Sequence, residues 1–258
     1  MIESGAAGRA ARAWRAAAAV VLGAAWLAGC GKGGSGEAAA DKSRGAPQVE
    51  STTASGAPAT GAGKRAMPAP PRALFIGTSL TAGLGLDDPA TQSWPAAIYH
   101  IADSTGYPLT VVNAGLSGET SAGALRRADW LLREPYDIVV IEAGANDGLR
   151  GIDPASTAEN IRGVIRKVRT ASPGAAILLV QMEAPTNMGP AYTRKFHELY
   201  PTVALSEGIT LLPFLLEGVG GVARLNQADG IHPTAEGARI AARNVWPGIR
   251  MVLRGLKR

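Results

Sequence analysis

The chain has 258 residues, of which 46% are hydrophobic and 18% are charged. This leaves room for one large domain or two small ones and supplies enough apolar residues for a core, and so low a charged fraction excludes a highly charged disordered chain. The formal charge is +5, and residues 1–29 contribute three arginines against one glutamate, a net of +2. No dense Lys/Arg stripe follows, so we expect no nucleic-acid partner. The one cysteine, Cys30, excludes an intramolecular disulfide and a cysteine-based metal cluster.

Residues 1–29 have the pattern of a signal peptide. Arg9, Arg12 and Arg15 form a positive region, and residues 16–28 are an uncharged apolar run too short to span a membrane comfortably. The run ends Leu27-Ala28-Gly29-Cys30, which resembles the lipobox of bacterial lipoproteins. That resemblance implies cleavage before Cys30 and lipidation of this residue. The alternative is an ordinary cleaved signal peptide followed by an incidental cysteine.

Lipidation at Cys30 would place the protein in the cell envelope. Several acyl chains on one residue anchor a protein stably, because each buried CH₂ contributes about 0.8 kcal/mol. We therefore expect a lipid-anchored protein that faces the periplasm. Gly31, rather than Asp, follows the cysteine, and by resemblance to Gram-negative sorting rules this favours the outer membrane.

Residues 30–70 form a segment of different composition. Gly, Ala, Ser, Pro, Thr and Lys dominate it, and large apolar side chains are scarce. Such a segment cannot bury enough apolar surface to fold. We interpret it as a flexible tether between the lipidated cysteine and a catalytic domain at residues 71–258.

The remaining residues alternate between short apolar runs and segments with helical spacing. Continuous apolar runs are typical of strands in a parallel sheet buried on both faces. Five strands alternating with five helices predict an α/β fold, a three-layer α/β/α sandwich with a five-stranded parallel sheet. The expected strands are residues 73–77, 109–113, 137–143, 175–181 and 209–213, and the expected helices are residues 93–104, 117–133, 156–170, 191–207 and 234–253.

Polar residues follow the strands, where a parallel α/β sheet binds its ligands. The first expected strand precedes Gly77-Thr78-Ser79-Leu80, the second precedes Ala114-Gly115-Leu116-Ser117-Gly118, and the third precedes Gly144-Ala145-Asn146-Asp147-Gly148. Asp229-Gly230-Ile231-His232-Pro233 lies directly before the last helix. The topology therefore predicts that these four segments meet at one edge of the sheet.

These segments contain the residue types that acyl transfer requires. A serine nucleophile needs a base, usually a histidine oriented by a carboxylate. Asp229 lies three residues before His232 in a short loop, which lets the carboxylate reach Nδ1 while Nε2 faces Ser79. The other two histidines, His100 and His197, lie within expected helices. An Asp-x-x-His pair alone is equally typical of an ordinary helix-entry loop.

The reaction also needs donors for the developing oxyanion. The Ser79 N–H is available at the start of a helix, Gly115 allows close backbone approach, and Asn146 offers its side-chain amide. Taken singly, Gly115 is equally well explained as a turn glycine and Asn146 as a turn or cap residue. Their occurrence together with the serine and histidine segments favours the catalytic interpretation.

The four segments resemble the four sequence blocks of the SGNH hydrolases, also called GDSL esterases and lipases, and within them the bacterial arylesterase, acyl thioesterase and lysophospholipase group. The resemblance implies the flavodoxin-like SGNH fold, Ser79 as nucleophile, and Asp229 and His232 as its partners. It also implies an oxyanion hole formed by the Ser79 N–H, the Gly115 N–H and the Asn146 side chain. No metal or organic cofactor is implied.

Two positions depart from the family pattern. Thr78 stands where the family usually has Asp, and Ala145 stands where Gly is usual. Neither change removes a reacting group. A threonine can still form hydrogen bonds, whereas a methyl group at Ala145 would narrow the pocket, or strain the loop if φ there is positive.

The substrate is less well specified. Residues 148–152 read as a glycine-bounded loop that closes over the substrate, with Leu149 and Ile152 against an acyl chain; Pro185 and Ile231 are further expected contacts. Short-to-medium acyl esters, aryl esters, thioesters and lysophospholipids all fit, and we expect a monomer. The alternatives are a carbohydrate O-acetyl esterase of the same fold and a catalytically weak envelope binding protein.

Overall fold

Five apolar segments form one sheet in the computed structural model, which describes residues 69–256. All neighbouring strands are parallel, and their order is β2-β1-β3-β4-β5. This confirms the predicted five-stranded parallel sheet, in the strand order of flavodoxin-like folds. The strands are β1 (Arg72–Gly77), β2 (Thr110–Gly115), β3 (Ile138–Ile141), β4 (Ala176–Val180) and β5 (Thr210–Leu212).

The central and edge strands differ in burial. β1 from Ala73 onwards and all four residues of β3 are buried, as expected for strands covered on both faces. β2 lies at an edge of the sheet, and its residues are half-buried or exposed. The expectation that every apolar run is buried on both faces is therefore wrong for β2, because an edge strand has a neighbour on one side only.

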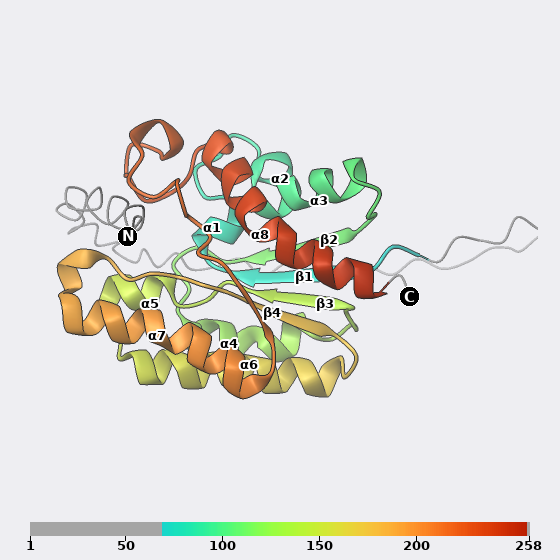
Figure 1. Cartoon of the computed structure of the whole chain (residues 1–258), viewed down its shortest axis with the longest axis horizontal. Coiled ribbons are helices and arrows are strands. Elements are labelled where there is room, and N and C mark those ends of the chain that lie inside the picture. Colours follow the sequence, from blue (N-terminus) through green and yellow to red (C-terminus); the bar gives the residue numbers. More distant parts are fainter. Residues whose placement is uncertain (1–68, 257–258) are drawn as a thin grey trace, which may run out of the picture. The chain divides into compact units, whose positions relative to one another are not determined.

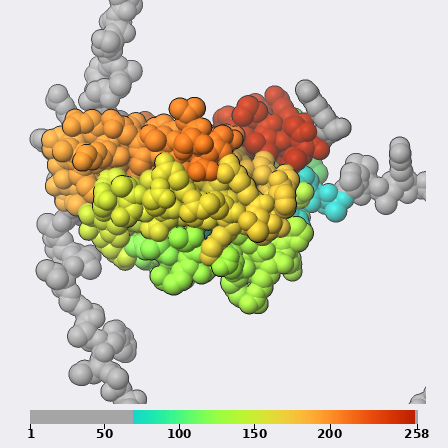
Figure 2. Space-filling view, turned by 90° about the horizontal axis from the view of Figure 1, so that it is seen from below, coloured from blue at the N-terminus to red at the C-terminus, as the bar shows by residue number. Residues whose placement is uncertain are grey.

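Helices cover both faces of the sheet, which completes the predicted three-layer sandwich (Figure 1). α3 and α8 pack together on one face, while α4, α6 and α7 lie side by side on the other (Figure 2). None of the helices within residues 69–256 is long and apolar enough to cross a membrane. The long helices are α3 (Trp94–Ser104), α4 (Ser121–Leu131), α6 (Pro154–Ala171), α7 (Pro190–Glu207) and α8 (Ala235–Leu256).

Short helices occupy the connections. Three of them, α1 (Ser79–Ala82), α2 (Pro89–Gln92) and α5 (Ala145–Arg150), follow β1 or β3, and two are 3₁₀ turns, η2 (Thr186–Met188) and η3 (Ala223–Leu225). Because the strands are parallel, the carboxyl ends of β1, β2 and β3 meet at one edge of the sheet. The chain order reverses at β1, which has β2 on one side and β3 on the other. Such a switch point is where open α/β sheets bind ligands.

Candidate active site

Ser79 lies at the turn from β1 into α1. It is the first residue of the helix, so its N–H is one of the four at a helix start that lack an intrahelical acceptor. Thr78 caps the helix by accepting a hydrogen bond from the Leu80 N–H. The serine is largely buried, and its hydroxyl lies 2.9 Å from Nε2 of His232. The turn therefore presents the Ser79 side chain to a histidine 153 residues later in the chain.

The second ring nitrogen of His232 contacts a carboxylate. Its Nδ1 lies 2.6 Å from Oδ2 of Asp229, while Oδ1 accepts the N–H groups of Ile231 and His232 at 2.9 and 3.0 Å. Burial alone would raise the pKa of Asp229, but the hydrogen bonds from the His232 side chain and from the two N–H groups outweigh it and lower that pKa. Asp229 is thus held as the ionised partner of the imidazole.

Gln227 ties this loop to the nucleophile turn. Its side-chain amide donates to the Leu84 carbonyl at 2.7 Å and to the Pro233 carbonyl at 3.0 Å. Its backbone N–H also donates to the carbonyl of His232 at 2.7 Å. One glutamine therefore links the segment that carries His232 to the residues directly after α1. Nothing in the sequence pattern singled it out, because the two segments are far apart in the chain.

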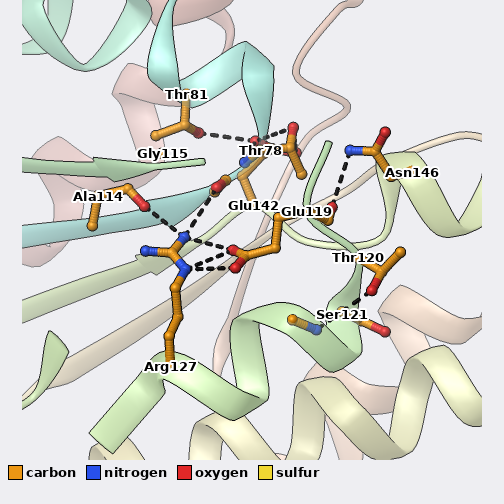
Figure 3. Close-up of polar contacts among 12 residues, drawn as sticks. Thr78, Thr81, Ala114, Gly115, Glu119, Thr120, Ser121, Arg127, Glu142 and Asn146 are labelled. Carbon is orange, nitrogen blue, oxygen red and sulfur yellow. Dashed lines mark hydrogen bonds and ion pairs between the residues drawn. The ribbon is translucent and has the colours of Figure 1, made fainter. Parts of the chain in front are cut away.

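Asn146 lies in the first turn of α5, after β3. One N–H of its side-chain amide donates to the Glu119 carbonyl at 3.0 Å, and an amide nitrogen carries two such hydrogens (Figure 3). The preceding Gly144 has φ 104°, whereas Ala145 is already helical. The strain considered for Ala145 is therefore absent, because the positive φ falls on Gly144.

Gly115 departs from its expected role. Its N–H donates to Oδ1 of Asn113 at 2.9 Å, so it is not free to face an oxyanion. A Cβ at this position would lie 2.1 Å from the backbone nitrogen of Ala82. The close packing of β2 against α1 explains this glycine, and the prediction of a Gly115 donor is not supported by the geometry.

Gly118 is the better placed donor. Among the described residues, no acceptor is found for its N–H. The next residue, Glu119, accepts the Asn146 side chain, and Arg150 donates to the Gly118 carbonyl at 3.0 Å. Gly115 is the last residue of β2 and Gly118 follows three residues later, so spacing in the sequence alone does not distinguish the two as candidate donors.

A buried carboxylate lies behind the nucleophile turn. Oε2 of Glu142 accepts the Thr78 N–H at 2.8 Å and the Thr81 hydroxyl at 2.9 Å, and the Thr78 hydroxyl lies 3.0 Å from it (Figure 3). Burial raises the pKa of Glu142 to about 7, although these hydrogen bonds oppose the shift. Thr78 therefore still caps α1 and donates to Glu142. Sequence reasoning missed Glu142 because it lies within an apolar strand segment.

The expected substrate contacts lie at different depths. Leu149 is exposed on α5, Ile152 and Ile231 are half-buried, and Pro185 is buried. The expected loop at residues 148–152 is largely helix, because Gly148 is buried within α5 and Gly151 caps its end. A small pocket next to Ser79 and His232 contains none of these four residues; it is lined by Leu80, Gly83, Leu84, Leu86, Trp94, Leu215, Leu216, Pro233, Ala238 and Ala241.

Three leucines are exposed on the segments that follow the first three strands. Leu84, Leu116 and Leu149 are each about half exposed, and they lie on the segments that follow β1, β2 and β3.

Within residues 69–256, no group of three or more His, Cys, Asp or Glu side chains is arranged to hold a metal ion.

Comparison with known proteins places this geometry in context. Residues 75–240 match the model of the GDSL-like lipase/acylhydrolase family. The chain is 44% identical over 181 residues to esterase TesA of Pseudomonas aeruginosa, covering 70% of this chain and 88% of that protein. It is 37% identical over 164 residues to thioesterase 1/protease 1/lysophospholipase L1 of Escherichia coli K12, and this match covers 63% of this chain and 76% of that protein. The crystal structure of AlinE4, an SGNH-hydrolase family esterase, matches with a TM-score of 0.60 at 34% identity. This match covers 72% of this chain and 98% of the AlinE4 chain.

Proposed function

The chain belongs to the GDSL-like lipase/acylhydrolase family and is a carboxylic ester hydrolase, and we propose that it works through an acyl-enzyme on Ser79. The observation that carries the proposal is the continuous chain of contacts from Ser79 Oγ through His232 to Asp229, at 2.9 and 2.6 Å. This arrangement lets Nε2 accept the hydroxyl proton while Nδ1–H donates to the carboxylate.

The cycle has two halves. Ser79 Oγ attacks the ester carbonyl carbon, and its proton passes to Nε2 of His232. The tetrahedral intermediate collapses, His232 returns the proton to the leaving alcohol or thiol, and the acyl group stays on Ser79. Water, deprotonated by His232, then attacks the acyl-enzyme and releases the acid. Asp229 stabilises the imidazolium in both halves.

Three donors would bind the oxyanion. We assign this role to the Ser79 N–H, the Gly118 N–H in place of Gly115, and the second N–H of the Asn146 amide. The first lacks an intrahelical acceptor, and the other two belong to neighbouring segments joined through Glu119. Donors fixed in advance at such a site are among the largest contributions to catalysis.

An apolar acyl or aryl group is the favoured substrate portion. The exposed leucines Leu84, Leu116 and Leu149 offer apolar surface on three segments around the site. This favours acyl esters, aryl esters, thioesters or lysophospholipids over the polar ring of an acetylated sugar. Ile152, Pro185 and Ile231 remain proposed contacts, and the membrane anchor at Cys30, with a preference for the outer membrane, remains a proposal based on residues outside the described range.

Hydrolysis of p-nitrophenyl esters from acetate to palmitate tests the proposal. We expect activity with the wild-type chain and at least about a 10³-fold loss in Ser79→Ala, since the attacking oxygen is removed. The chain-length optimum would define the size of the acyl site. Activity that survives Ser79→Ala would overturn the assignment, and hydrolysis of acetylated sugars alone would favour the deacetylase.

A further inference from the structure

The guanidinium of Arg127 lies where three chain segments meet. Its Nη2 donates to the Ala114 carbonyl at 2.7 Å and to the Gly77 carbonyl at 3.3 Å, at the carboxyl ends of β2 and β1 (Figure 3). Gly77 directly precedes Thr78 and Ser79. A single side chain of α4 therefore holds together the two strand ends from which the nucleophile turn and the Leu116–Glu119 turn begin.

The same guanidinium binds a buried carboxylate. Nε of Arg127 lies 2.6 Å from Oε1 of Glu119, and Nη2 lies 2.6 Å from Oε2. The exposed fractions of the two side chains are 20% and 5%. A carboxylate so deeply buried needs a paired charge, and a planar fork with two parallel contacts also fixes its orientation. Gly123 leaves room for the pair, because a Cβ there would lie 2.7 Å from Cγ of Glu119.

Glu119 connects this ion pair to the proposed oxyanion donors. Its carbonyl accepts one N–H of Asn146 at 3.0 Å, and its own N–H donates to the Leu116 carbonyl at 3.2 Å. The turn so closed contains Gly118. Fixing the side chain of Glu119 thus fixes both the peptide beside Gly118 and the acceptor that orients the Asn146 amide.

We propose that Arg127 is a positioning residue for the oxyanion hole, acting through Gly77, Ala114 and Glu119 without touching the substrate. The inference rests on the proposed function. Transition-state donors contribute only when they are held at the correct distance, and a misplacement of about 1 Å can cost a factor of roughly 100 in rate. Lysine carries the charge but lacks the planar fork, so it can replace only part of this role.

The test compares Arg127→Met and Arg127→Lys with the wild type in the full chain. We expect Arg127→Met to lower kcat for a p-nitrophenyl ester by roughly 10–100-fold and to change KM less than about twofold, because ground-state contacts are kept. Arg127→Lys should be intermediate. Arg169→Met is the matched control: Arg169 pairs with Glu207 away from the site, so its loss should lower stability without changing kcat.

Two further measurements separate positioning from folding. Glu119→Gln keeps the side-chain shape but removes its charge, and it should lower kcat in the same direction while remaining folded by circular dichroism. Covalent inactivation by diethyl p-nitrophenyl phosphate, whose phosphoryl oxygen needs the same donors, should slow in parallel with kcat in all three variants. An unchanged kcat in folded Arg127→Lys and Glu119→Gln would overturn the inference while Ser79-dependent hydrolysis still stands. Hydrolysis that survives Ser79→Ala would overturn both the proposed function and this inference.

Discussion

At the scale of single residues, the proposed nucleophile Ser79 and base His232 come from segments 153 residues apart, and the Gln227 side chain links these segments. Ser79, Asp229 and His232 could be selected because serine hydrolysis restricts which residue types can act together, and the structure brings these three side chains into contact. The sequence pattern predicts Gly115 as an oxyanion donor, whereas in the structure its N–H already donates to the Asn113 side chain. Gly115 also packs tightly against the backbone of Ala82, whereas Gly118 has no such close neighbour.

Glu142 gives a prediction for stability against pH. Its pKa is about 7 in the folded protein and about 4.5 in the unfolded chain, because burial disfavours the charge. The folded state therefore holds the Glu142 proton more tightly than the unfolded chain does. The stability that this proton contributes is fully present below pH 4.5 and is lost as the pH rises through about 7. We expect Glu142→Gln, which cannot ionise, to gain stability relative to wild type by roughly 3 kcal/mol between pH 4.5 and pH 8.

Urea unfolding at pH 4.5 and pH 8 measures this difference. Glu198→Gln on the exposed surface of α7 is the control, and it should show little change relative to wild type at either pH. If Glu142→Gln differed from wild type by the same amount at both pH values, then the ionisation of Glu142 would not be linked to folding.

At the scale of elements, sequence periodicity located the five strands and the five long helices within a few residues. Periodicity did not predict the short helices α2 and α5. One-turn helices have too few residues for a periodic pattern, and they form because caps and tertiary contacts support them. The strand order and the exposure of β2 were also outside its reach, since an apolar run does not specify which neighbours it will have.

The start of α5 depends on Gly144. This residue has φ 104°, and a Cβ there would lie 2.3 Å from the hydroxyl oxygen of the buried Tyr200. We expect Gly144→Ala to lower the free energy of unfolding by about 2 kcal/mol or more, because backbone strain and the collision add. Ala145→Gly, at a position that is already helical, should cost about 1 kcal/mol or less.

A double-mutant cycle separates the two causes. Tyr200→Phe removes the colliding oxygen together with its hydrogen bond to the Ala143 carbonyl, which alone should cost about 1 kcal/mol. In the Tyr200→Phe background, Gly144→Ala should lower the free energy of unfolding by less than it does in the wild type. The loss that remains is the cost of the backbone strain. Equal costs in both backgrounds, measured by urea unfolding, would show that Tyr200 does not limit this position.

At the scale of the whole molecule, the residues proposed for catalysis all lie within residues 69–256. The predicted signal peptide and the predicted lipidation site Cys30 lie outside this range. The described part of the chain contains the sheet, both helical layers and every side chain proposed for the site. We therefore expect that the loss of a membrane anchor would leave ester hydrolysis unchanged. The segment before Pro71 was assigned by composition and by the Leu27-Ala28-Gly29-Cys30 pattern alone.

Cys30→Ala tests that expectation. A bacterial host that expresses the protein and grows with a fatty acid analogue should label the wild-type chain and leave Cys30→Ala unlabelled, because lipidation needs the thiol. The site proposed for catalysis lies within residues 69–256, so kcat/KM of Cys30→Ala for a soluble p-nitrophenyl ester should stay within about twofold of wild type. Label that persists in Cys30→Ala would place the modification elsewhere. An unlabelled wild type would instead favour an ordinary cleaved signal peptide, with Cys30 as an incidental residue of the tether.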